Sequence, residues 1–210
     1  MTPSLANFEE TLRLVPLVAI LRRPTADLDL CARMLGEAGV RLVEVTIDTP
    51  GAVEFLQRRT AEASSTFYGA GTVLTVELAE RAISAGATFL VTPNYSTEVI
   101  ALARAHGRFI FTGAMTPTEI YNAFRAGANM IKVFPAASLG PNYFRELRGP
   151  LMDIPLMATG GISPQNAAEF FRAGVAAIGV GSSLNPKNDS AAEVTRIQQV
   201  VQQLLAAARP

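Results

Sequence analysis

The sequence is poor in the residues that form disulfides and bind metals. Its 210 residues include one cysteine, one histidine and no tryptophan. A lone Cys31 excludes an internal disulfide framework and a cysteine metal cluster. His106, in "ARAHGR", is placed for a surface or capping role at a helix end rather than for a metal site or a Ser-His-Asp triad. We therefore expect a protein that uses no metal and no other cofactor.

Excess charge and long apolar runs are also missing. Eighteen basic and eighteen acidic residues give a formal net charge of zero, which argues against nucleic acid and anionic membrane as partners. No apolar run approaches the roughly 20 residues of a membrane helix. The first fifteen residues contain acidic side chains in an amphipathic helical pattern, unlike a signal peptide. We expect a cytoplasmic protein that forms one domain over residues 1–210.

Short apolar segments alternate with segments of helical periodicity along the whole chain. The apolar segments are residues 16–21, 41–46, 67–71, 88–92, 108–112, 129–134, 155–159 and 176–181. Nearly all-apolar strands that alternate with helices are typical of a parallel sheet covered on both faces. Eight such units predict an α/β (β/α)8 TIM barrel, here with an extra N-terminal helix. A doubly wound open sheet is the alternative, but no G-x-G-x-x-G opens its first turn.

Two charged residues interrupt these apolar strands. Lys132 lies within 129–134, although sixteen of the eighteen basic residues are arginine and only Lys187 is another lysine. Glu44 lies within 41–46. A buried lysine can lose its proton and attack a ketone, which a guanidinium cannot do, and a buried carboxyl can move protons. The pair predicts Schiff-base chemistry; the alternative is a structural ion pair inside the barrel.

Polar residues recur at the carboxyl ends of the predicted strands, where TIM barrels place their active sites. Thr72, Thr92, Thr112 and Thr159 stand at or just after four strand ends, and we expect one or two of them to contact a ligand. The turns "TGGIS" (159–163) and "GVGSSL" (179–184) follow the last two strands. Barrels commonly bind phosphate there through backbone N–H groups. The candidate phosphate-binding residues are Gly160, Gly161, Gly181 and Ser182.

Seven stretches covering nearly the whole chain carry a family resemblance. They are "PLVAILR", "VEVTIDTP", "GAGTVL", "VTPN", "IKVFPAASLGPNYF", "TGGISPQN" and "GVGSSL". In this order they resemble the 2-keto-3-deoxy-6-phosphogluconate aldolases of the Entner-Doudoroff pathway and their phosphogalactonate relatives. That family consists of trimeric (β/α)8 barrels with metal-free, class I chemistry, so the resemblance implies a homotrimer.

The resemblance also implies roles for individual residues. Lys132 corresponds to the Schiff-base lysine and Glu44 to the general acid/base. The substrate-binding residues implied are Thr72 and Phe134 beside the pyruvyl part, together with Pro93 and Thr159. The phosphate would be held by the glycines and the serine of the two turns, Gly160, Gly161, Gly181 and Ser182.

One position departs from the phosphogluconate branch. There, "VEVT" is followed by a hydrophobic residue and then an arginine that binds the substrate carboxylate, whereas this chain has Asp48. The phosphogalactonate branch instead carries an arginine directly after the first strand, in "AILRG". This chain has "AILRR", so Arg22 matches that arginine. The stretches "VTPN" and "LGPNY" also resemble the phosphogalactonate branch. Asp48 could pair with Arg22 or Arg23, and both sugar-acid epimers remain candidate substrates.

These observations lead to one expected activity and two alternatives. We expect an aldolase that reversibly cleaves a 2-keto-3-deoxy-6-phosphosugar acid into pyruvate and glyceraldehyde 3-phosphate. The first alternative is cleavage of 4-hydroxy-2-oxoglutarate into pyruvate and glyoxylate by the same residues. The second is a phosphosugar-binding barrel without covalent chemistry, in which Lys132 is only an ion-pair partner.

Overall fold

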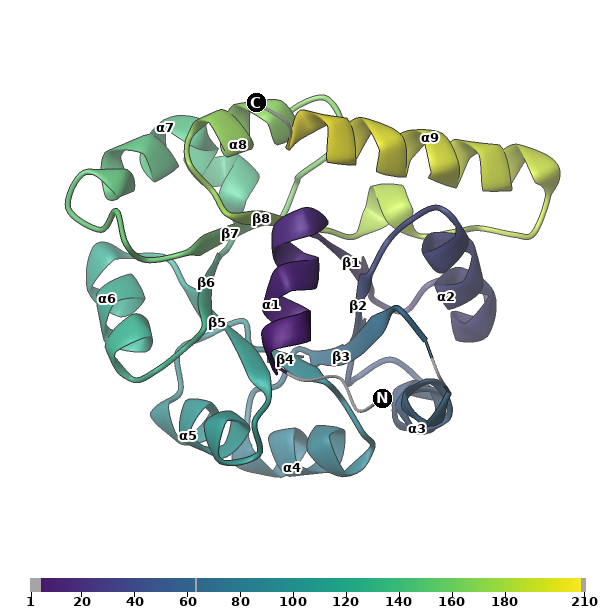
Figure 1. Cartoon of the computed structure of the whole chain (residues 1–210), viewed down its shortest axis with the longest axis horizontal. Helices are drawn as coiled ribbons and strands as arrows, with labels where there is room; N and C mark the ends of the chain where they lie inside the picture. Colours follow the sequence, from purple (N-terminus) through teal and green to yellow (C-terminus); the bar gives the residue numbers. More distant parts are fainter. Residues whose placement is uncertain (1–4, 63, 209–210) are drawn as a thin grey trace.

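The chain folds into a closed barrel of eight parallel strands (Figure 1). The computed structural model describes residues 5–62 and 64–208. Each strand pairs with the next, and β8 closes the barrel against β1, so the predicted TIM barrel is confirmed. Every predicted apolar segment contains one strand, and only β5 extends beyond its predicted end. The strands are β1 Leu17–Leu21, β2 Leu42–Thr46, β3 Phe67–Gly71, β4 Phe89–Val91, β5 Phe109–Ala114, β6 Met130–Val133, β7 Leu156–Thr159 and β8 Ala177–Val180.

Helices form the outer layer of the barrel and bury their apolar sides against it (Figure 1). Those between successive strands are α2 Leu28–Glu37, α3 Ala52–Ala61, α4 Val76–Ser84, α5 Thr97–Ala105, α6 Pro117–Arg125, α7 Ala136–Arg148 and α8 Ala167–Arg172. After β8 come the short 3-10 helix η1 Ser182–Leu184 and the long α9 Ala191–Ala207. Within residues 5–62 and 64–208, no helix has the length and apolarity needed to cross a membrane.

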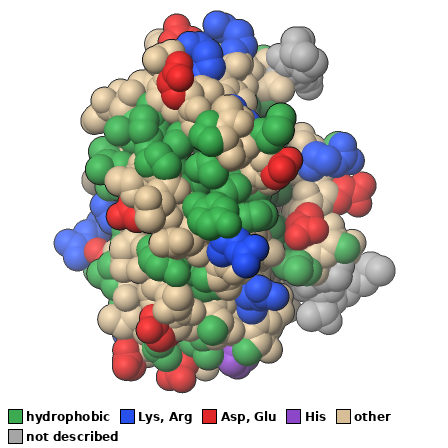
Figure 2. All heavy atoms as spheres, turned by 90° about the vertical axis from the view of Figure 1, so that its left-hand side faces the viewer, with side chains coloured by type: hydrophobic (Ala, Val, Ile, Leu, Met, Phe, Trp, Pro, Cys, Tyr) green, Lys and Arg blue, Asp and Glu red, His purple; other side chains and the backbone are tan. Residues whose placement is uncertain are grey.

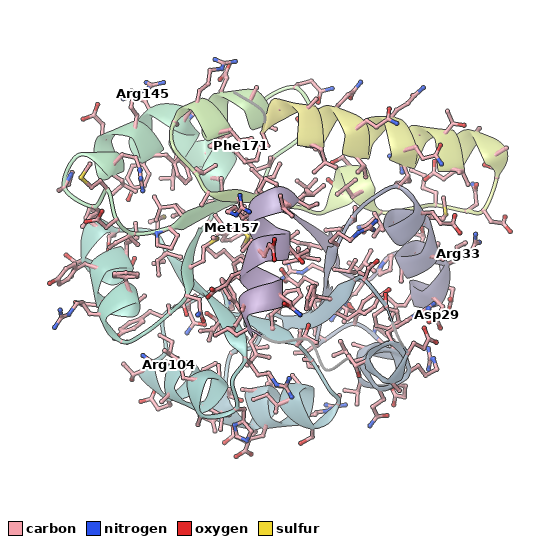
Figure 3. The ribbon with its side chains drawn as sticks, viewed as in Figure 1. Asp29, Arg33, Arg104, Arg145, Met157 and Phe171 are labelled. Carbon is pink, nitrogen blue, oxygen red and sulfur yellow. The ribbon has the colours of Figure 1, made fainter. Side chains whose placement is uncertain are left out.

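The predicted N-terminal helix is α1, Leu5–Leu14, and it covers the N-terminal end of the barrel (Figure 1). The first four residues of the predicted helical segment lie outside the described residues. Figure 3 shows Met157 of β7 beside α1 at this end of the barrel. Phe8 of α1 is buried, with ring centroids 4.6 to 6.3 Å from those of Phe67, Phe89, Phe109 and Phe111. This aromatic cluster packs inside the barrel at its N-terminal end.

The interior near the carboxyl ends of the strands includes two glycines with close neighbours. Strand alternation places Gly113 of β5 and Gly179 of β8 on the inner wall. A Cβ atom at Gly113 would lie 2.2 Å from the carbonyl carbon of Pro93, and one at Gly179 would lie 2.4 Å from Thr159 Oγ1. Glycine at these two positions therefore lets Pro93 and Thr159 pack directly against the inner wall at the C-terminal end of the barrel.

Candidate active site

A cavity of about 410 Å3 opens at the carboxyl ends of the strands. Its lining comes from β1, β2, β6, β7 and β8 and from the turns that follow the strands. The structure brings all eleven predicted site residues to this one cavity: Arg22, Glu44, Thr72, Pro93, Lys132, Phe134, Thr159, Gly160, Gly161, Gly181 and Ser182. Segments that are far apart in sequence therefore meet at a single site.

Lys132 projects from β6 into this cavity and is only 7% exposed. Within the described part of the chain, its Nζ atom makes no hydrogen bond and no ion pair within 4.0 Å. The Phe134 ring, with its centroid 5.9 Å from Nζ, is the cation–π neighbour. A structural ion pair with Glu44 is therefore not formed, and the amine faces the cavity without a bonded partner.

Glu44 of β2 is buried at 1% exposure, and its Oε2 atom accepts no hydrogen bond from the described residues. Burial raises the pKa of this carboxyl above its ordinary value of 4.5, and the opposing effects of Lys132 and Arg22 are smaller. A raised pKa favours the protonated form of the carboxyl, and a positioned carboxyl can both accept and return a proton. Glu44 is therefore the candidate general acid and base.

Arg22 and Thr72 form a polar contact on the cavity wall. Arg22 Nη2 donates to Thr72 Oγ1 at 3.2 Å. Thr72 adopts the left-handed backbone conformation, with φ +59°. For a β-branched residue this conformation costs about 1–3 kcal/mol, and such strain is concentrated at functional sites.

Asp48 lies outside the cavity lining and is engaged by Arg23, not Arg22. Arg23 Nη2 lies 3.1 Å from Asp48 Oδ2. A hydrogen bond from the Thr46 side chain lowers the pKa of Asp48, and the two arginines lower it further. Asp48 is therefore ionised at neutral pH. Of the two adjacent arginines, Arg22 is the one that remains at the cavity.

The two glycine turns keep backbone groups available at one side of the cavity. Gly160 and Gly161 have φ of +94° and +73°, a region that other residues rarely adopt. Asn166 holds the first turn, since its Nδ2 donates to Gly161 O and its Oδ1 accepts from Ser163 N, both at 2.9 Å. The backbone N–H groups of Gly161 and Ser182 make no hydrogen bond with the described chain. They could bind an anion.

The predicted rim threonines divide into two groups. Thr72 and Thr159 line the cavity, so they are the two that stay candidates for contact with a ligand. Thr92 instead accepts from Gly113 N at 3.1 Å and donates to Asn94 O at 2.7 Å. Thr112 is buried, and in β5 it stands between Phe111 and Gly113, which face inward. Because side chains alternate along a strand, Thr112 faces the outer side of the barrel. Neither of these two residues lines the cavity.

His106 has the predicted capping role. It ends α5, and its ring Nδ1 lies 3.0 Å from Leu102 O. Among the described residues, no group of three or more His, Cys, Asp and Glu side chains is placed to hold a metal ion.

Five lining residues were not among those predicted: Ile20, Thr46, Ile162, Gly179 and Asn185. Strand alternation could have found three of them, because Ile20, Thr46 and Gly179 share the inner face with residues that were predicted. Asn185 has no comparable signal, since it lies in the irregular segment after η1. Its Oδ1 is buried and accepts no hydrogen bond from the described chain.

A second, larger cavity of about 620 Å3 lies at the opposite end of the barrel, between α1, α8 and the end of α9. Figure 3 labels Phe171, one of its lining residues, on α8. Its walls include Leu12, Phe109 and Met130 and the exposed Arg13 and Arg172. It contains neither a buried amine nor a buried carboxyl. Chemistry rather than size therefore identifies the cavity around Lys132 as the candidate active site.

Several known proteins that resemble this chain are aldolases of one family. A family model described as KDPG and KHG aldolase matches residues 8–200. The 2-dehydro-3-deoxy-6-phosphogalactonate aldolase of Escherichia coli K12 is 36% identical over 173 residues, covering 81% of this chain and 84% of the relative. The 2-dehydro-3-deoxy-phosphogluconate aldolase of Treponema pallidum is 38% identical over 162 residues, covering 77% and 76%. A solved structure described as native KDPGal is 32% identical, with a TM-score of 0.79 and coverage of 91% and 93%.

Proposed function

Because the chain belongs to the KDPG and KHG aldolase family, we propose how its residues cleave a 2-keto-3-deoxy-6-phosphosugar acid into pyruvate and glyceraldehyde 3-phosphate. The chain is a carbon–carbon lyase. Its relatives are named for the gluconate and galactonate forms of the substrate, and both belong to the proposed substrate class. The observation that carries the proposal is a buried amine without an ion-pair partner that shares one cavity with a carboxyl of raised pKa.

Lys132 is the nucleophile in this proposal. Its Nζ attacks the C2 ketone, and the resulting carbinolamine loses water to give an iminium ion. The iminium is the electron sink for cleavage, because the electrons of the breaking C3–C4 bond move toward the positive nitrogen. The enamine of pyruvate is then protonated at C3, and hydrolysis of the imine regenerates the amine.

Glu44 moves the protons. As the C3–C4 bond breaks, the C4 hydroxyl loses its proton to Glu44, through a water molecule, and C4 becomes the aldehyde carbon of glyceraldehyde 3-phosphate. The same carboxyl then returns that proton to C3 of the enamine, and during imine hydrolysis it takes a proton from the attacking water and passes it to the departing amine. Its raised pKa supports this role, because a catalytic group works best when its pKa lies near the operating pH.

The two ends of the substrate need different donors. Arg22 binds the keto-acid carboxylate, for which a guanidinium has matching geometry, and Thr72, Pro93, Phe134 and Thr159 surround the pyruvyl part. Gly160, Gly161, Gly181 and Ser182 hold the phosphate through backbone N–H groups and the serine hydroxyl. The unbonded N–H groups of Gly161 and Ser182 support this assignment.

The phosphate site separates the proposal from cleavage of 4-hydroxy-2-oxoglutarate, a substrate without phosphate. Inorganic phosphate should therefore compete with the sugar-acid substrate and should inhibit 4-hydroxy-2-oxoglutarate cleavage poorly. The non-covalent alternative requires Lys132 to be an ion-pair partner, and the separation of Lys132 from Glu44 argues against it.

We also propose that the protein is a cytoplasmic homotrimer. An apolar surface supports self-association: α6 exposes Tyr121 and Phe124, and the exposed Met115 lies just before it. Figure 2 shows hydrophobic side chains gathered on the side of the molecule that carries α6. Light scattering should give three times the 22.3 kDa of one chain. Phe124→Glu should shift that mass toward the monomer.

Trapping with borohydride tests the proposed function directly. Reduction in the presence of pyruvate should add one pyruvyl-derived mass to the peptide that contains Lys132. Lys132→Arg should abolish the label, because a guanidinium forms no such imine. Lys187→Arg is the matched control and should label normally, since Lys187 is exposed and outside the cavity. A label on Lys187, or none, would overturn the proposed function.

A further inference from the structure

Asn185 brings to the cavity a polar group that the mechanism above does not use. It lines the cavity together with Gly181 and Ser182. Its Oδ1 is buried and accepts no hydrogen bond from residues 5–62 or 64–208. An unpaired buried acceptor destabilises a protein, so such a group at a substrate cavity points to a donor on the ligand.

The main chain around Asn185 is fixed by α9. Arg196 Nη2 donates to Asn185 O at 3.1 Å, and Nη1 donates to Ser183 O at 2.8 Å. The same guanidinium bonds both carboxylate oxygens of Glu193, at 2.8 and 2.7 Å. Glu193 Oε1 also accepts the Lys187 backbone N–H at 2.8 Å. One planar guanidinium therefore ties the segment that carries Asn185 to a long, packed helix.

The chemistry of the substrate selects the group that Asn185 meets. An amide oxygen accepts hydrogen bonds, so its partner must be a donor. The carboxylate, the ketone and the ionised phosphate offer only acceptors, which leaves the C4 and C5 hydroxyls. The C4 hydroxyl gives its proton to Glu44. The C5 hydroxyl is next to C6, which carries the phosphate, and the phosphate end belongs with Gly181 and Ser182.

We propose that Asn185 is a specificity-determining residue that accepts a hydrogen bond from the C5 hydroxyl of the substrate, and that Arg196 positions it. In the reverse direction this hydroxyl is the C2 hydroxyl of glyceraldehyde 3-phosphate. The inference rests on the proposed function, because the phosphosugar acid supplies the hydroxyl.

The test is the addition of pyruvate to two aldehydes: glyceraldehyde 3-phosphate and its analogue without the C2 hydroxyl. The unmodified protein should favour the natural aldehyde in kcat/KM by roughly 10- to 100-fold, because a site built to bond a hydroxyl rejects the analogue that lacks it. Asn185→Leu, of similar size but without an acceptor, should bring this ratio close to one. Asn185→Asp keeps an acceptor oxygen and should keep the preference.

Arg196 is tested with the same ratio. Arg196→Gln should reduce the preference between the aldehydes, and Arg196→Lys should restore part of it. A purely structural residue would instead slow both aldehydes equally. An unchanged ratio in Asn185→Leu, whether or not both rates fall, would overturn the role of Asn185. The same result in Arg196→Gln would overturn the positioning role.

Borohydride trapping of pyruvate on every variant keeps the two proposals apart. If the unmodified protein showed no trapping of pyruvate on Lys132, the proposed function would be overturned. Normal trapping on Lys132 in Asn185→Leu, together with an unchanged aldehyde ratio, would overturn this inference alone.

Discussion

Glu44 crosses the inner wall of the barrel over Gly71, so closely that a Cβ atom at Gly71 would lie 1.7 Å from Glu44 Oε1. The two residues lie on paired strands, with Thr46 opposite Gly71 and Glu44 opposite Gly69. Gly71 does not have a positive φ, so the backbone there would accept other residues. Space, rather than backbone conformation, requires glycine at this position. The location of the carboxyl group is therefore set by the absence of a side chain on the neighbouring strand.

The first prediction concerns this contact. Gly71→Ala should displace the Glu44 carboxyl and lower kcat by about 10²–10⁴-fold, the range that general acid–base catalysis contributes. Pyruvate trapping by Lys132 should persist. Gly36→Ala is the control, because a Cβ there meets only Thr66 Oγ1 at 3.7 Å, an ordinary contact, and its kcat should not change. Steady-state kinetics of both variants decide the matter, and a normal kcat for Gly71→Ala would refute the spatial argument.

The second prediction concerns Glu44 itself. Glu44→Gln keeps the shape of the side chain and removes proton transfer, so kcat should fall by about 10²–10⁴-fold. Lys132 should still bind pyruvate. Single-turnover cleavage, with the retained pyruvate trapped by borohydride, separates the two steps. A variant within twofold of the unmodified protein would reduce Glu44 to a structural residue.

The third prediction follows from the sign of the pKa shift. Burial raises the pKa of Glu44 in the folded state above 4.5, so between the two values the folded state binds more protons than the unfolded chain. The free energy of unfolding therefore falls as pH rises through the raised pKa. Glu44→Gln has no such dependence and should be more stable at pH 8 by on the order of 1–3 kcal/mol, the range for a buried group without a partner.

Urea denaturation across the pH range measures this difference. The advantage of Glu44→Gln should shrink as the pH is lowered through 4.5, and it should be smallest well below 4.5, where the carboxyl of the unmodified protein is neutral in both states. Equal stability of the two proteins at pH 8 would mean that the charge on Glu44 is fully compensated, which its unpaired Oε2 argues against.

The sequence was sufficient to predict the barrel and the residues that meet at the cavity around Lys132, because both depend on local patterns. Each strand is a short apolar segment, and the charged or glycine-rich interruptions stand at the ends of strands, where a barrel gathers them. Lys132 and Glu44 were identifiable because a charge inside an apolar strand is too unfavourable to keep without a use.

Features that depend on contacts between distant segments could not be predicted. Phe8 packs on rings from three different strands, and its amphipathic helix gives no sign of which end of the barrel it covers. Asn185 belongs to no periodic element, and its backbone is held by Arg196 from a helix that follows it. The sequence also left the partner of Asp48 undecided, because Arg22 and Arg23 are adjacent.

The last prediction assigns different roles to these two arginines. Arg22 lines the cavity and donates to Thr72, whereas Arg23 has left-handed φ of +44° and pairs with Asp48. Arg22→Ala should weaken pyruvate binding by about 1.5–3 kcal/mol, the scale of a hydrogen bond to a charged group. Arg23→Ala should change it little, because an exposed ion pair contributes about 0–1 kcal/mol.

Asp48→Asn should alter mainly the preference between the two epimeric phosphosugar acids, through the position of the loop after β2. Pyruvate affinities from trapping titrations, with kcat/KM for each epimer, test all three variants. If Arg23→Ala raised the Michaelis constant while Arg22→Ala left it unchanged, the carboxylate would bind to the other arginine.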